Sequence, residues 1–130
     1  MKSNKTSKFS TSWKGSKKPR KQRKYRAKSP LHIKQRFVHS HLSKDLRQKY
    51  KKRNIGLRKG DKVKVMCGNF KKHEGKVERI DLKKTRVFVS GVEMTKRDGA
   101  KKMLILHPSN LMITEINLDD KLREKVLQRK

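Results

Sequence analysis

The sequence predicts a mainly β protein: a small barrel with a basic extended N-terminal arm, a short helix before the barrel and a C-terminal helix. Short apolar runs follow one another between residues 63 and 114, separated by turn or polar residues, as in small all-β folds. The chain has 130 residues, of which 31% are hydrophobic, which suits one domain with a small core.

The charge predicts the partner. The chain holds 40 Lys and Arg against 11 Asp and Glu, for a net charge of +29, and such self-repulsion opposes compaction unless a polyanion neutralises it. We expect a nucleic acid, and no membrane partner, because no apolar run approaches the roughly 20 residues of a spanning helix. The start of the chain lacks a secretory signal, and the one cysteine cannot form an internal disulfide, so we expect a cytoplasmic protein.

Residues 1–28 form the arm. They contain no acid and few apolar residues, so we expect the arm to be disordered when free and to bind RNA. Trp13 and Tyr25 stand among its cations, a composition that can stack on unpaired bases while Lys and Arg meet phosphates. The other interpretation is a solvated tail that acts as a localisation signal or solubility device.

Residues 29–58 form an extension with enough apolar residues to pack on something. Ser43 is a suitable N-cap and Asp45 would lie in the first turn, which predicts a short helix from about Lys44 to Lys51. Cations at its end complement the helix dipole and leave a basic terminus free to face phosphate.

Residues 59–116 should form five or six short strands. Val63, Val65 and Cys67 alternate with polar residues, which predicts a strand with one buried face and Cys67 as a small buried residue. Val77 and Ile80 are three apart, so a bulge or bend is needed to bury both. Further strands are expected in "TRVFVS" (85–90), "VEM" (92–94), "MLIL" (103–106) and "LMIT" (111–114), with Asp98-Gly99 at a hairpin tip and "HPSN" (107–110) as a turn.

Residues 117–130 predict a closing helix. Asn117 would be its N-cap, two aspartates would lie in its first turn, and Leu118, Leu122 and Val126 would form its apolar stripe.

Glycines bound the basic loop "NFKKHE" (69–74). Gly68 and Gly75 would let the backbone come close to another backbone, here a phosphodiester, while Lys71 and Lys72 reach phosphate. On the strand before the loop, Lys62 and Lys64 should point outward.

The candidate RNA-binding residues share a basic or aromatic side chain in the arm, the extension or the barrel. They are Trp13, Lys14, Lys17, Lys18, Arg20, Lys21, Arg23, Lys24, Tyr25, Arg26, His32, Lys34, Arg36, Arg47, Lys51, Arg53, Arg58, Lys62, Lys64, Lys71, Lys72, Lys76, Lys83, Lys84 and Arg86.

Enzymatic and metal-binding functions are not expected. Cys67 and His73 could pair as nucleophile and base, but the sequence singles out no third group to orient them. The five histidines lack a recognised zinc spacing. His107 is expected to shape the turn that Pro108 begins, with RNA contact as the alternative. No cofactor is expected.

The segment from Gly60 to Asp81, "GDKVKVMCG" followed by a basic loop and "GKVERID", resembles the KOW motif of ribosomal proteins and transcription elongation factors. Its flanks, "SPLHIKQRFVHSHLSKDLRQKY", "HPSNLMIT" and "NLDDKLREK", are similar to the archaeal and eukaryotic form of large-ribosomal-subunit protein twenty-four, called twenty-six in eukaryotes.

This resemblance implies an SH3-like barrel with terminal extensions. It also implies a structural ribosomal protein that binds large-subunit rRNA near its 5′ region, early in assembly, close to the exit of the peptide tunnel. The partners would be rRNA and neighbouring ribosomal proteins, without a homo-oligomer. The alternative is a KOW-containing transcription elongation factor, a class that usually adds a separate, less basic domain.

Overall fold

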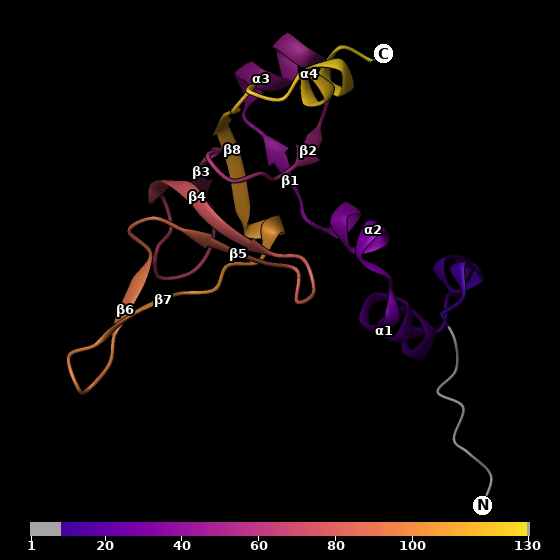
Figure 1. Ribbon diagram of the computed structural model, residues 1–130, viewed down its shortest axis with the longest axis horizontal. Coiled ribbons are helices and arrows are strands. Elements are labelled where there is room, and N and C mark those ends of the chain that lie inside the picture. The colour runs from indigo at the N-terminus through magenta and orange to yellow at the C-terminus, as the bar shows by residue number, and fades with distance from the viewer. Residues whose placement is uncertain (1–8, 130) are drawn as a thin grey trace, which may run out of the picture.

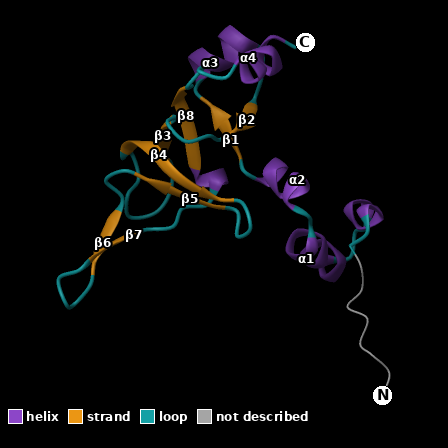
Figure 2. Cartoon of the chain, in the orientation of Figure 1, coloured by secondary structure: helices purple, strands orange, loops and turns teal. Residues whose placement is uncertain are grey.

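The computed structural model describes residues 9–129. Within that range, helices precede and follow a set of short strands, which confirms the mainly β fold (Figures 1 and 2). The strands are β1 (His39–Leu42), β2 (Asn54–Gly56), β3 (Lys62–Val65), β4 (Glu74–Asp81), β5 (Arg86–Val89), β6 (Glu93–Thr95), β7 (Lys101–Met103) and β8 (Leu111–Glu115). The α-helices are α1 (Pro19–Lys28), α2 (Leu31–Lys34), α3 (Lys44–Tyr50) and α4 (Lys121–Gln128); the 3-10 turns are η1 (Thr11–Gly15), η2 (Gln35–Phe37) and η3 (Pro108–Asn110).

The main sheet has the strand order β2-β1-β8-β3-β4-β5, in which β1 and β8 are parallel and the other pairs antiparallel. The order is open, with β2 and β5 at its ends, so closure into a barrel stays a prediction. Strands β6 and β7 form a separate hairpin that projects from the sheet on the side away from the arm helices (Figure 1).

The core lies on the inner face of the sheet. Val63 and Val65 of β3 face Leu111 and Ile113 of β8, and all four are at most 1% exposed. The expected alternation on β3 is therefore confirmed. The register of β4 against β5 shifts between Val77 and Arg79, which confirms the bulge expected between Val77 and Ile80.

The helix α3 begins and ends close to the predicted positions. The Ser43 side chain accepts a hydrogen bond from the backbone N–H of Leu46, and Asp45 lies in the first turn. Lys51 ends the helix in the left-handed conformation, with φ of 52°.

The predicted hairpin tip is also confirmed. Gly99 has φ of 80°, its N–H donates to Lys96 O, and Lys96 N–H donates to Ala100 O. The two strands lie closer to the hairpin tip than predicted, at 93–95 instead of 92–94 and at 101–103 instead of 103–106, because Val92 and Leu106 leave the hairpin and enter the core.

Two packing predictions are wrong. Cys67 is exposed rather than buried, because β3 ends at Val65 and the chain turns through Gly68, whose φ is 90°. The C-terminal helix begins later than expected, with Asp120 rather than Asn117 as its N-cap.

This later start changes which face of α4 is buried. Arg123 and Leu127, one turn apart, face inward. The predicted stripe faces solvent instead: Leu118, Leu122 and Val126 are 42%, 69% and 42% exposed.

The arm contains more helix than the sequence suggested. Its composition favoured no regular element, yet η1 and α1 occupy much of residues 9–28. Pro19 begins α1 at a position where its missing N–H costs nothing. Disorder of the free arm stays a prediction.

Candidate nucleic-acid interface

The helix α1 carries a high positive charge. Its sequence is PRKQRKYRAK, without an acid, so cations three and four residues apart repel one another along its surface. A polyanion at this surface would remove that repulsion and stabilise the helix.

An aromatic cluster attaches the arm to the extension. Ring centroids of Tyr25 and Phe9 are 5.3 Å apart, those of Tyr25 and Phe37 5.9 Å, and those of Phe9 and Trp13 6.1 Å. Tyr25 is only 9% exposed. Tyr25 is therefore a packing residue in this structure, and base stacking remains a prediction for the half-buried Trp13.

Gln22 joins η1 to α1. Its Nε2 donates to the carbonyl oxygens of Ser16 at 2.6 Å and Lys14 at 2.9 Å. Nothing in the sequence indicated this contact, because a glutamine among cations looks like an ordinary polar helix residue.

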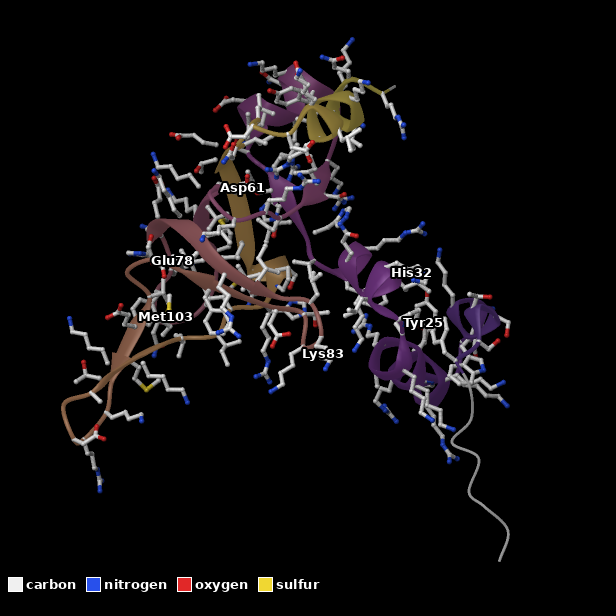
Figure 3. The ribbon with its side chains drawn as sticks, in the orientation of Figure 1. Tyr25, His32, Asp61, Glu78, Lys83 and Met103 are labelled. Carbon is white, nitrogen blue, oxygen red and sulfur yellow. The ribbon has the colours of Figure 1, made fainter. Side chains whose placement is uncertain are left out.

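Cations from distant parts of the sequence meet at a basic pocket between α1, α2 and the β4–β5 turn. This pocket of about 520 Å³ is lined by Arg23, Arg26, Ala27, Lys34, Phe37, Lys83, Lys84, Thr85 and His107. Figure 3 labels Lys83 at the tip of the turn and Tyr25 on α1. Among residues 9–129 the lining contains no carboxylate, and its five Lys and Arg are all residues that the sequence predicted to bind RNA.

The pocket has a defined shape because its turn is fixed by hydrogen bonds. Lys34 Nζ donates to Lys83 O at 2.9 Å, which connects α2 to the turn. Asp81 Oδ1 accepts from Lys84 N–H at 3.1 Å, and Thr85 has φ of 51°. A concave group of cations on a fixed backbone is suited to phosphate oxygens.

The other predicted cations do not gather in this pocket. Three of them form ion pairs: Lys62 Nζ with Glu115 and Lys64 Nζ with Glu74, each at 2.9 Å, and Arg58 with Asp120. The hydrogen bond to Glu115 raises the pKa of Lys62, and the hydrogen bond from Lys64 lowers the pKa of Glu74.

The remaining predicted residues lie outside the basic pocket. His32 and Arg36 line a larger groove beside α4. The side chains of Lys14, Lys17, Lys18, Arg20, Lys21, Arg47, Lys51, Arg53, Lys71, Lys72, Lys76 and Arg86 are exposed, and that of Lys24 is half-buried.

His41 lies close to two cations, one in α3 and one after it. Partial burial, and then the charges of Arg47 and Arg53, lower the pKa of its imidazole. Two arginines are thus close enough to one histidine to affect its protonation.

The role expected for Gly75 is different in the structure. A Cβ there would lie 2.5 Å from Ser90 O and 2.8 Å from Val89 Cγ1. The close backbone is therefore that of the neighbouring strand β5 and its end, not a phosphodiester. Lys71 and Lys72 remain exposed in the turn before it.

His107 has the turn-shaping role that the sequence favoured. Its Nδ1 lies 2.7 Å from Ser109 Oγ and accepts from Ser109 N–H at the start of η3. The same residue lines the basic pocket.

A buried ion pair between Asp61 and Arg123 was not expected from the sequence. Nη1 and Nη2 of Arg123 donate to the two carboxylate oxygens at 2.6 Å and 2.7 Å, and both side chains are at most 3% exposed. Asp61, labelled in Figure 3, also accepts from the backbone N–H groups of Arg58 and Asn117. This pair attaches α4 to the sheet. The sequence could have indicated it only if the face of α4 that is turned toward the core had been predicted correctly.

No group of three potential metal ligands occurs in the described part of the chain. Within residues 9–129, no helix has the length and apolarity needed to cross a bilayer.

Comparison with known proteins gives the family. Residues 16–130 match the family model that describes the ribosomal proteins called L26 in eukaryotes and L24 in archaea. The chain belongs to this family. The KOW motif within it stays a prediction.

This chain aligns with nearly the whole length of two curated relatives. The "Large ribosomal subunit protein uL24" of Methanothrix thermoacetophila is 50% identical over 114 residues, which is 88% of this chain and 98% of the relative. The protein of the same name from Methanosphaera stadtmanae is 48% identical over 115 residues, with the same coverage. Membership of a ribosomal-protein family confirms the expectation of a non-enzymatic component.

Proposed function

We propose that this chain is a structural constituent of the large ribosomal subunit, located in the cytoplasm within the ribosome, and that it binds large-subunit rRNA. The observation that carries the rRNA proposal is the basic pocket, where the described lining contains Arg23, Arg26, Lys34, Lys83 and Lys84 and no carboxylate. Family membership supports the ribosomal assignment.

The pocket would contact the RNA backbone. Lys and Arg side chains bind phosphate oxygens without reading bases, so they give affinity and orientation. Specificity would then come from the shape of the folded RNA and from any unpaired bases that meet the arm. Phosphate in the pocket would also hold α1 and the β4–β5 turn together, because each contributes cations to it.

The test compares two variants that lose the same charge. The pocket variant is Arg23→Gln/Arg26→Gln/Lys83→Gln/Lys84→Gln. The hairpin variant carries glutamine at the four exposed cations Lys96, Arg97, Lys101 and Lys102 of the β6–β7 hairpin. Affinity for a transcript of the large-subunit rRNA 5′ region is measured at several KCl concentrations, and circular dichroism checks that both variants fold.

The expected result is a larger loss for the pocket variant. Each phosphate contact removed should reduce the magnitude of the slope of log K against log salt by about 0.7 to 0.9, so a reduction of up to about 3.6 is expected for the four pocket substitutions. An equal loss in the hairpin variant would mean that net charge alone sets the affinity, and the pocket would have no special role.

The resemblance also supports two finer proposals: early binding during subunit assembly, and a position near the exit of the peptide tunnel. Pulse labelling of assembling subunits would test the first, since the labelled chain should enter the earliest particles. Cross-linking of the chain to a stalled nascent peptide would test the second.

A further inference from the structure

We propose that a groove beside α4 is the docking site for a segment of a neighbouring protein that carries apolar side chains on one face and carboxylates next to them. This proposal rests on the proposed function, because it specifies which kind of protein segment a ribosomal protein of this type would bind. The groove has a volume of about 1070 Å³ and lies between α4, β2, α2 and the end of β4. We call it the α4 groove.

The floor of the α4 groove is aliphatic. Its lining includes Ile55 and Leu57, Ile80 at the end of β4, Leu82 just after β4, and Leu122 and Val126 from α4. Leu122 is 69% exposed and Val126 42% exposed, and they lie one turn apart on the same helix face. A contiguous apolar surface of this kind marks an interaction site in a soluble protein.

The rim of the groove is basic. Arg36, Lys52, Lys59 and Arg79 are among the lining residues, and Glu78 is the one exposed acid among the described residues that line it. Figure 3 labels Glu78 on β4 and His32 on α2, the two elements on either side. An occupant with carboxylates beside its apolar face would complement this rim.

One buried donor in the lining also lacks an acceptor. Arg123 is 4% exposed, and its Nε is the one buried side-chain nitrogen or oxygen without a hydrogen-bond partner in the described part of the chain. Its two terminal nitrogens are satisfied by Asp61, Asn117 and Gly56. Since a buried donor left unpaired costs free energy, a carboxylate or carbonyl oxygen of the occupant would be favoured near this side chain.

These features favour a protein over RNA or a second copy of the chain. No aromatic ring other than histidine is among the described lining residues, whereas unpaired bases are usually held by stacking on aromatic rings. A second copy would bring another net charge of +29 to a basic rim. An acidic amphipathic segment matches both the floor and the rim, in the manner of a helix bound in a groove.

The first experiment uses a fluorescein-labelled 14-residue amphipathic peptide of leucine and glutamate, with a leucine and glutamine peptide beside it. The full chain is compared with Leu122→Ser/Val126→Ser and with the matched control Met94→Ser/Ile105→Ser, whose residues are 56% and 41% exposed and lie outside the groove. Titration in about 0.15 M salt, where the Debye length is about 8 Å, limits diffuse charge association.

The groove variant should bind the glutamate peptide about tenfold more weakly or worse, because two apolar contacts are lost. The control should stay within about twofold of the unchanged chain, and the glutamine peptide should bind more weakly than the glutamate peptide. Equal binding by the two variants overturns the proposal.

A second experiment places a photo-cross-linking amino acid at Leu122 in the chain assembled into ribosomes. The proposal expects a cross-link to a ribosomal-protein peptide rich in apolar and acidic residues; a cross-link to rRNA, or none, overturns it. The groove variant should also keep its rRNA affinity. Failure of the groove and failure of the basic pocket are therefore seen in separate measurements.

Discussion

Replacing Arg123 by methionine tests how strongly the buried ion pair holds α4 on the sheet. The substitution keeps a long side chain but removes both hydrogen bonds to Asp61, and the carboxylate is 0% exposed. Breaking a buried pair by removing one partner typically costs about 3–5 kcal/mol. Asp61 keeps two backbone N–H donors, from Arg58 and Asn117, so we expect the lower part of that range.

The expected loss is large enough to measure. About 3 kcal/mol corresponds to a fall in Tm of about 10 °C for a chain of this size. Urea unfolding followed by far-UV circular dichroism gives the free energy of unfolding directly, in the absence of RNA.

Arg58→Met is the matched control, because it removes the same charge and also breaks an arginine–aspartate pair next to α4. The Arg58 and Asp120 side chains are 48% and 33% exposed, and exposed pairs contribute at most about 1 kcal/mol. If Arg123→Met destabilised the chain no more than Arg58→Met, burial of the pair would not be what holds α4.

Three further predictions concern single positions. Gly75→Ala should destabilise the chain by about 1–3 kcal/mol, because its Cβ would meet backbone at 2.5 Å. Gly15→Ala should be close to neutral in the same urea titration, because its Cβ would meet no neighbouring atom of residues 9–129 within 4 Å. The hydrogen bond from Arg58 lowers the pKa of Asp120 below its ordinary value of 3.8; its contribution is therefore present above pH 3.8 and lost as pH falls through the lower folded value. Asp120→Asn should accordingly reduce Tm at pH 6, and this reduction should shrink as the pH falls below 3.8; a reduction that stays constant as the pH falls would contradict this. If the arginines beside His41 bind phosphate, the pKa of its imidazole should rise when RNA binds, which NMR titration of the free and bound chain would detect; an unchanged pKa would place the RNA elsewhere.

Local signals in the sequence predicted most of the strands and α3. The alternation of Val63 and Val65, the three-residue spacing of Val77 and Ile80, and the Asp98-Gly99 tip each depend on residues that are neighbours along the chain. Such features were confirmed because the physical cause and its effect lie within one element and its turn.

The errors came from tertiary packing. The stripe of Leu118, Leu122 and Val126 has correct helical spacing, but the start of α4 at Lys121 and the partner at Asp61 turn Arg123 inward instead. Cys67 continues the alternation of β3 in sequence, although the strand has already ended. Neither outcome could be read from spacing, since each depends on a residue far away or on a backbone turn.

For the candidate site, the sequence predicted that basic residues would form it but not which of them would lie together in one pocket. It proposed cations over the whole chain, and the structure brings five of them to one pocket and pairs three others with acids.

The positions of the acids explain how a chain of net charge +29 can form a compact body. Asp61, Glu74, Glu115 and Asp120 each pair with a cation of the sheet or its adjoining segments, so repulsion is reduced where strands and α4 must pack. Helix α1 has no acid, and within the described chain the five cations of the basic pocket form none of these ion pairs. Because a paired cation must first give up its carboxylate to bind phosphate, we expect a bound polyanion to gain the most free energy at the unpaired group. Phosphate bound between the arm and the β4–β5 turn would therefore add to the hydrogen bond that connects α2 to this turn and to the ring contact that connects Tyr25 to Phe37.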